Sequence, residues 1–191
     1  MCGKPIVDEV MKGYNATIFA YGQTSAGKTH TMQGAGDIKS EELKGIIPRT
    51  CENIFQSVYE ADENIEFTVK VGYIEIYMER IRDLLNVEGS NLQIREDPVL
   101  GIYVDKMMEQ YVTSPSEMLS LMDVGAGNRA VAATGMNEGS SRSHSVFCVT
   151  VEQVDTRSGS RKKGRLYLVD LGIDRLYFSV SFLEFIIYFS I

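Results

Sequence analysis

The sequence predicts an α/β fold with a largely β core, and two observations carry this prediction. Apolar segments with the period-2 pattern of strands alternate with segments in which apolar residues recur at helical spacing. A glycine-rich loop follows the first strand and leads into a helix, the order seen in phosphate-binding motifs. The 191 residues are 44% hydrophobic and 24% charged, an ordinary composition for a chain with one sizeable core.

The first part of the chain alternates helix and strand. A helix is predicted over residues 5–14, because a proline stands in its first turn and apolar residues share one face. Residues 15–21 predict a buried strand, and residues 29–33 continue from the glycine-rich loop as a helix. After a polar loop over 33–45, apolar residues recur at helical spacing within 47–58.

The middle of the chain holds the clearest strand, residues 65–73, in which apolar and polar residues alternate as on a half-buried sheet. Residues 80–85 predict a short amphipathic helical turn, and 91–111 predict short strands broken by a proline and a glycine. Residues 114–117 form a capping box with proline at the first helical position, which opens a helix running toward Gly125.

Two further strands are predicted over residues 143–153 and 166–171, joined by a turn over 155–164. A cluster of basic residues lies in this turn and directly after it, and a solvated hairpin is a better interpretation of this cluster than a binding patch. The basic residues are Arg157, Arg161, Lys162, Lys163 and Arg165.

The glycine-rich loop has the complete pattern G-x-x-x-x-G-K-[ST]. Its two glycines allow a tight turn that directs backbone N–H groups at phosphate oxygens. In such loops the lysine reaches the β- and γ-phosphates and the final hydroxyl coordinates Mg²⁺. The chain is therefore predicted to bind a nucleoside triphosphate. The predicted nucleotide-binding residues are Gly22, Gln23, Thr24, Ser25, Ala26, Gly27, Lys28 and Thr29.

Two later segments belong with this loop. Residues 137–144 combine small hydroxyl side chains with an arginine and a histidine, which suits a loop that senses a γ-phosphate. On composition alone, a polar loop before a strand is the stronger interpretation. Asp170 ends an apolar strand, and an aspartate in that position holds Mg²⁺ in P-loop NTPases.

The bulk properties exclude other classes. A net charge of −7 argues against nucleic acid as the main partner, because neutralising phosphates requires a basic face. The three cysteines, Cys2, Cys51 and Cys148, show no C-x-x-C spacing, which predicts reduced cytosolic thiols, with neither a disulfide framework nor a zinc site. The N-terminus lacks the pattern of a signal peptide.

In chain order, these motifs resemble those of the kinesin motor domain. Their residues are most similar to those of the conventional kinesin heavy chain class. The resemblance covers about residues 1–171. It is carried by Gly13-Tyr14-Asn15, Ala20 to Met32, Gly45 to Arg49, Glu75-Ile76-Tyr77, Arg82 to Leu85, Asn137 to His144 and Leu166 to Leu171.

The resemblance implies roles for individual residues. His30 would lie beside the adenine, and Asn137 would open the first switch loop, which ends at His144. Ser140 would lie near the γ-phosphate and the catalytic water, and Ser141 would contact Mg²⁺ and the γ-phosphate. Arg142 would pair with an acidic residue of the second switch, which begins at Asp170. The implied catalytic residues are Lys28, Ser140 and Arg142, and the implied metal ligands are Thr29, Ser141 and Asp170.

The resemblance also implies a function. The family couples ATP hydrolysis, with Mg²⁺ as cofactor, to stepping along microtubules, which places such proteins in the cytoplasm on the cytoskeleton. Residues 92–111 would include a secondary contact to β-tubulin. No nucleic acid or membrane partner is expected, and we expect the oligomerisation region of the family to lie outside these residues. A GTPase is disfavoured because no N-K-x-D signature follows the loop.

After Asp170 the chain departs from the family, which has D-L-A-G-S-E there. This chain has Asp170-Leu171-Gly172-Ile173-Asp174-Arg175, so the glycine comes one position early and Arg142 lacks its expected glutamate; Asp174 is a possible substitute. We interpret residues 1–171 as a motor domain that is incomplete at both ends. Residues 172–191 are then an apolar non-family tail produced by truncation or intron read-through.

The alternatives for the tail are a native buried strand or helix and a membrane anchor. The alternative function is a non-catalytic fragment that binds ATP weakly or not at all. We expect the 191 residues by themselves neither to move along microtubules nor to bind them tightly.

Overall fold

The computed structural model describes residues 3–35, 42–88, 90–98, 101–135 and 143–172. Of the predicted tail at 172–191, residues 173–191 lie outside the described residues. The helices are α1 (Lys4–Met11), α2 (Lys28–Gln33), α3 (Ile46–Tyr59) and α4 (Pro115–Gly135). The strands are β1 (Ala16–Ala20), β2 (Ile65–Tyr77), β3 (Arg80–Asp83), β4 (Ser90–Asp97), β5 (Gly101–Asp105), β6 (Gln110–Val112), β7 (His144–Asp155) and β8 (Arg161–Asp170).

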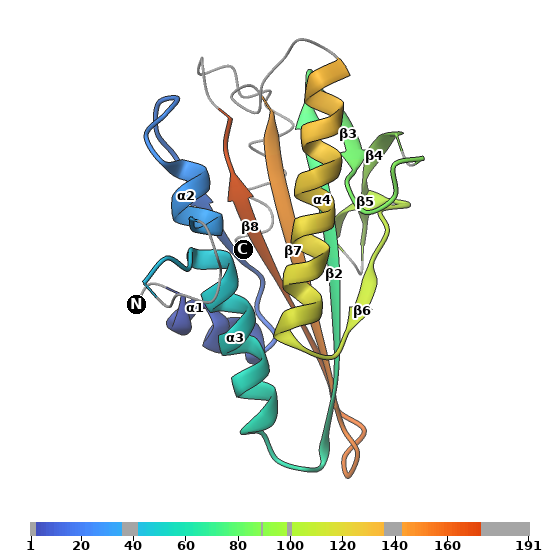
Figure 1. Cartoon of the computed structure of the whole chain (residues 1–191). Helices are drawn as coiled ribbons and strands as arrows, with labels where there is room; N and C mark the ends of the chain where they lie inside the picture. Colours follow the sequence, from blue (N-terminus) through green and yellow to red (C-terminus); the bar gives the residue numbers. More distant parts are fainter. Residues whose placement is uncertain (1–2, 36–41, 89, 99–100, 136–142, 173–191) are drawn as a thin grey trace.

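One eight-stranded sheet organises the chain, with the order β1-β8-β7-β2-β3-β4-β5 and with β6 paired to β2 (Figure 1). Strand β1 runs parallel to β8, and the other pairs are antiparallel. The long β2–β7–β8 ladder forms the centre of the sheet. The prediction of an α/β fold with a largely β core is therefore confirmed.

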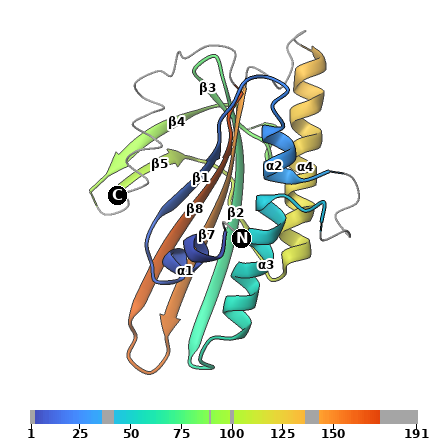
Figure 2. The same cartoon turned by 90° about the vertical axis from the view of Figure 1, so that its left-hand side faces the viewer.

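The helices and the outer strands cover opposite faces of the sheet. Figure 2 shows α2, α3 and α4 on one side and β4 and β5 extending on the other. The larger core cluster joins residues from all four helices, such as Val7, Met32, Ile54 and Met118, to Tyr73 and other residues of the central strands. A second apolar cluster lies on the opposite face and includes residues of β5, β7 and β8.

The predicted helical turn at 80–85 is wrong, because its first four residues form strand β3, which pairs antiparallel with β2. Met78 and Glu79, with φ angles of 47° and 61°, form the two-residue turn between these strands. Ile81 and Asp83 are buried on alternate positions, a period-2 pattern that a four-residue segment displays too briefly to be distinguished from a helical one.

Strand β1 was predicted as buried, but it stands at the edge of the sheet and is partly exposed. Its Phe19 side chain is 56% exposed. Strand β2, in contrast, continues past the predicted end at Tyr73 as far as Tyr77, and its second half is buried on both faces. Burial on both faces removes the alternation that predicted the first half.

Helix α4 continues ten residues beyond the predicted stop at Gly125. Gly125 does not end the helix but lies against the ring of Tyr73, where an added Cβ would come within 2.1 Å of Tyr73 Cδ1. The capping box is present in altered form: the Ser114 hydroxyl accepts the Glu117 N–H at 3.2 Å, whereas the Glu117 carboxylate accepts the N–H of Thr113 at 2.6 Å.

The predicted turn at 155–164 is shorter in the structure, because β8 already begins at Arg161. Most of the basic cluster therefore belongs to a strand and not to a turn. Its side chains are nevertheless solvated, and Lys163 pairs with Glu152 across the β7–β8 ladder at 2.9 Å.

Candidate nucleotide-binding site

The glycine-rich loop connects the end of β1 to the start of α2. Ser25 and Gly27 have φ angles of 65° and 85°, so two nearby residues lie in the left-handed region. An added Cβ at Gly27 would meet nothing within 4 Å, so glycine is favoured there by its positive φ angle and not by a lack of space. At Gly22 an added Cβ would come within 3.3 Å of Ala26 Cβ, so the loop is closely packed across its base.

The Lys28 side chain lies back over this loop. Its ammonium donates to the carbonyl oxygens of Gly22 at 2.9 Å and Gln23 at 3.0 Å. The positive charge is thus held at the rim of the loop by neutral acceptors. A phosphate oxygen is a stronger acceptor for an ammonium group than a carbonyl, so the lysine can transfer to an anionic ligand.

Parallel pairing brings a distant carboxylate to the loop. Because β1 pairs with β8, Ala20 lies opposite Asp170, and both strands end at the same edge of the sheet. The Thr29 hydroxyl donates to Asp170 Oδ2 at 2.6 Å, across 141 residues of sequence. A hydroxyl and a carboxylate oxygen are hard donors of the kind Mg²⁺ prefers, so the two predicted metal ligands that the structure describes fit this ion.

These residues line an open pocket of about 320 Å³. The predicted His30 belongs to the lining and is exposed, beside the loop and the end of β8. Asn137, Ser140, Ser141 and Arg142 lie outside the described residues. The pocket is lined by Thr24, Ser25, Gly27, Lys28, Thr29, His30, Asp170, Leu171 and Gly172.

Arg129 of α4 is a buried cation beside the pocket that the sequence reasoning missed. It donates to Ser143 O at 2.8 Å, and it forms ion pairs with Glu75 at 3.4 Å and Asp170 at 3.8 Å. A signal for this network existed in the sequence, because Glu75 interrupts an apolar strand. A carboxylate buried in that position requires a charged or hydrogen-bonding partner.

The start of β7 lies against the end of β8. An added Cβ at Gly172 would come within 2.3 Å of Ser143 O, so the two backbones are in close contact there. Burial, followed by the nearby positive charge of Arg129, lowers the pKa of His144 below its ordinary value of 6.5. His144 is therefore neutral at physiological pH.

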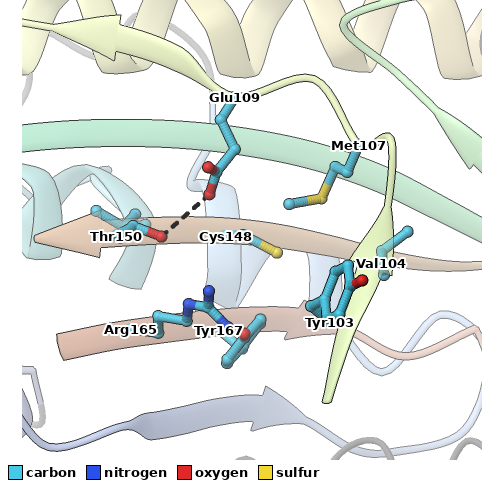
Figure 3. A pocket seen from close by; sticks show the side chains of 9 residues that line it. Tyr103, Val104, Met107, Glu109, Cys148, Thr150, Arg165 and Tyr167 are labelled. Carbon is cyan, nitrogen blue, oxygen red and sulfur yellow. Dashed lines mark hydrogen bonds between the residues drawn. The ribbon is translucent and has the colours of Figure 1, made fainter. Parts of the chain in front are cut away.

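A second pocket of about 100 Å³ lies on the opposite face of the sheet, between β5 and the β7–β8 ladder. Figure 3 shows Tyr103, Met107, Cys148 and Tyr167 around it, with the Thr150 hydroxyl donating to Glu109 at 3.3 Å. Burial raises the pKa of the Cys148 thiol far above its ordinary value, which keeps this thiol protonated. The pocket is too small for a nucleotide and contains none of the phosphate-loop residues.

The strand, loop and helix order, the G-x-x-x-x-G-K-T loop and the aspartate at the neighbouring strand end define a P-loop nucleotide-binding protein. A family model described as the kinesin motor domain matches residues 1–176, past the predicted boundary at residue 171. The chain belongs to the kinesin motor domain family.

Relatives support this assignment. The chain is 55% identical over 168 residues to a kinesin heavy chain of Syncephalastrum racemosum, covering 88% of this chain and 18% of that protein. It is 52% identical over 170 residues to the human kinesin-1 heavy chain, covering 89% of this chain and 17% of the relative. The chain thus spans less than a fifth of the length of these relatives.

The solved structure of a fast kinesin matches with a TM-score of 0.85 and 48% identity, over 95% of this chain and 52% of that one. The predicted kinesin motor fold is confirmed. Within the residues that the structure describes, no helix has the length and apolar character needed to cross a bilayer.

Proposed function

We propose that this chain is the nucleotide-binding part of an ATP-driven microtubule motor. The observation that carries the proposal is the hydrogen bond between Thr29 and Asp170, because it brings together two Mg²⁺-type oxygen donors from distant parts of the chain beside Lys28. The relatives named above are kinesin heavy chains, which supports the microtubule as track and the cytoplasm as location.

The residues of this chain would act by positioning and by charge. Lys28 would exchange its two carbonyl acceptors for β- and γ-phosphate oxygens, while backbone N–H groups of residues 22–27 surround the phosphates. Thr29 and Asp170 would hold Mg²⁺. The bound ion would neutralise charge that develops on the phosphate oxygens during transfer to water. Ser140 and Arg142 remain proposed catalytic residues, with Asn137 and Ser141 as proposed nucleotide contacts.

The nucleotide site is tested by binding of a fluorescent ADP, mant-ADP, to the Lys28→Ala variant. We expect its affinity to fall about 10- to 100-fold, since loss of a charged hydrogen bond costs about 1.5–3 kcal/mol. Lys12→Ala is the matched control, because Lys12 is an exposed lysine directly after α1 that pairs with Glu9. Unchanged affinity in Lys28→Ala would refute the site. Competition of ATP and of GTP with mant-ADP shows whether the site prefers adenine or guanine.

The motor function is tested with the full gene product. Microtubules are expected to stimulate its ATP hydrolysis, and hydrolysis that is insensitive to tubulin would contradict the proposal. The second candidate, a non-catalytic fragment, is favoured by the sequence after Asp170, where the family's glycine and glutamate positions are not kept. Under that alternative mant-ADP binds weakly, and Lys28→Ala does not change its affinity.

We also propose that the motor residues end at residue 171, where the tail begins.

A further inference from the structure

The basic hairpin between β7 and β8 takes no part in the nucleotide site. Figure 1 shows it at the opposite end of the sheet from α2, and residues 156–163 are all exposed. The chain has a net charge of −7, so this hairpin concentrates positive charge on an acidic protein. Positive charge beside exposed hydroxyl groups suits recognition by an enzyme whose active site is acidic. The hairpin residues are, in order, Thr156, Arg157, Ser158, Gly159, Ser160, Arg161, Lys162 and Lys163.

Three cations of this hairpin are paired loosely or not at all. The Arg157 side chain is 62% exposed, and its nitrogens lie 3.4 Å from Asp62 and 3.9 Å from Asp155. Arg161 and Lys162 are exposed as well, and neither has an ion pair with the residues that the structure describes. Exposed ion pairs contribute little, so all three cations can turn to another negatively charged group at low cost.

The two serines of the turn have different surroundings. The Ser158 hydroxyl accepts the N–H of Ser160 at 3.2 Å, and the N–H of Ser158 donates to Asp155 Oδ1 at 3.2 Å. A phosphate on Ser158 would therefore meet a carboxylate of the same turn, which repels it. The Ser160 hydroxyl has no hydrogen bond to any described residue. Ser160 is thus the exposed hydroxyl that can react without breaking the turn.

Ser160 also has a fixed spacing from the three cations. Arg157 stands three residues before it, and Arg161 and Lys162 are the next two residues. Basophilic protein kinases select serines that have basic residues on both sides, because carboxylates flank the catalytic centre of the kinase. Arginine is recognised there through charge-assisted hydrogen bonds, which are stronger than neutral ones.

We propose that Ser160 is a phosphorylation site for a basophilic serine kinase, and that its phosphate takes Arg157 from Asp62. In the transfer, Ser160 Oγ forms a bond to the γ-phosphorus of the ATP held by the kinase. The bond from that phosphorus to the β,γ-bridging oxygen breaks, ADP leaves, and the hydroxyl proton passes to the catalytic aspartate of the kinase.

The phosphate would change the charge of the hairpin. It adds about −1.5 to −2 charges and three acceptor oxygens, and it is a stronger partner for a guanidinium than a single carboxylate. Ser160 precedes β8, whereas Asp170 ends this strand beside the phosphate loop. The proposal therefore goes beyond the proposed function and does not depend on it.

The first test treats the chain with ATP, Mg²⁺ and the catalytic fragment of protein kinase C, a basophilic serine kinase, and locates the phosphate by mass spectrometry. We expect phosphate on Ser160, and Ser160→Ala should remove it. In Arg157→Ala, kcat/KM of the kinase should fall about 10- to 100-fold, as expected for one lost charged hydrogen bond. Arg95→Ala is the matched control, because Arg95 is another exposed arginine paired with an aspartate, and the rate should not change.

Ser145 is an internal control for folding. Arg142 stands three residues before it, the same spacing as between Arg157 and Ser160, but Ser145 is 3% exposed on β7. The folded chain should carry no phosphate on Ser145. Equal labelling of Ser145 and Ser160, labelling of Ser158 in place of Ser160, no incorporation, or an unchanged rate in Arg157→Ala would each overturn the proposal.

The second test follows the phosphate by ³¹P NMR titration. The second pKa of a phosphoserine is ordinarily about 6. A guanidinium beside the phosphate stabilises the dianion, so this pKa should be lower by about 0.2–0.7 in the phosphorylated chain than in phosphorylated Arg157→Ala. Arg95→Ala should keep the lower pKa. An equal pKa with and without Arg157 would overturn the transfer of Arg157 from Asp62 to the phosphate.

Discussion

Ion pairs lie at both ends of the β7–β8 ladder, but the two ends differ in how water reaches the charges. At the nucleotide end, the side chains of Arg129, Glu75 and Asp170 are each less than a tenth exposed. At the hairpin end, Lys163 and Glu152 are 38% and 32% exposed, and Arg157 is 62% exposed. Strand β8 therefore carries charges in two different dielectric environments, with Asp170 at its buried end and Lys163 toward its exposed end.

This difference in solvent exposure indicates which charges the stability of the fold depends on. A buried ion that loses its partner keeps the full cost of leaving water, so each member of the Arg129 cluster requires the others. An exposed ion that loses its partner is solvated instead, and salt screens what remains of the interaction. Precise geometry is expected at the nucleotide end, and tolerance to substitution at the hairpin end.

The largest effect is expected from Glu75→Ala. This change leaves Arg129 buried without its closest carboxylate, and we expect a loss of about 3–5 kcal/mol in the free energy of unfolding. Urea denaturation without nucleotide measures it. Glu66→Ala, on the exposed part of β2, is the control and should cost less than about 0.5 kcal/mol. A loss below about 1 kcal/mol for Glu75→Ala would remove the contrast between the two ends.

The next effect concerns the approach of α4 to β2. Gly125→Ala places a methyl group 2.1 Å from the Tyr73 ring, and we expect destabilisation by about 1–3 kcal/mol from overpacking. Gly127→Ala, two residues further on the same helix, meets nothing within 4 Å and should instead stabilise by about 0.5–1 kcal/mol. Thermal unfolding of both variants measures the two changes in stability. If both changes have the same sign, Gly125 does not set the distance between α4 and β2.

A smaller loss is expected from Thr29→Val, which keeps the side-chain shape but removes the hydrogen bond to Asp170. Without nucleotide, we expect about 1.5 kcal/mol of lost stability, because the acceptor is a buried carboxylate. Thr31→Val, at an exposed position of α2, controls for β-branched packing in the same helix. If the two variants unfold at the same urea concentration, the Thr29 bond contributes nothing without a ligand.

The smallest effect is expected at the hairpin end. The hydrogen bond and charge of Lys163, together with a smaller contribution from Lys70, lower the pKa of Glu152 below its ordinary value of 4.5, against the opposing effect of burial. The sign is that of a lowered carboxyl pKa: the stabilisation is present above pH 4.5 and is lost as the pH falls through the lowered pKa. Lys163→Ala should raise this pKa, measured by NMR titration, and cost less than about 1 kcal/mol. Lys162→Ala should leave the pKa of Glu152 unchanged.

Local pattern was sufficient for the parts of the molecule whose residues act within a few positions of one another. The phosphate loop, α2 and the strand that ends in Asp170 were predicted, because glycine spacing and an apolar run are visible in a short window. The same reasoning misplaced β3 and the end of α4. A four-residue strand has too few repeats to display its period, and a glycine inside a helix resembles a helix end when its packing partner is unknown.

The amino-acid sequence by itself determined that this chain has a phosphate-binding loop, an α/β core and the motifs of the kinesin motor domain. These properties depend on residue types at fixed spacings. Only the tertiary structure decided that Thr29 meets Asp170 and that Arg129 joins Glu75, Ser143 and Asp170. Those contacts connect residues up to 141 positions apart, and they arise from the parallel pairing of β1 with β8 and the close packing of α4 on β2. Neither arrangement leaves a periodic signal along the chain, because strand order and helix–sheet distance are set by the packing of the whole core.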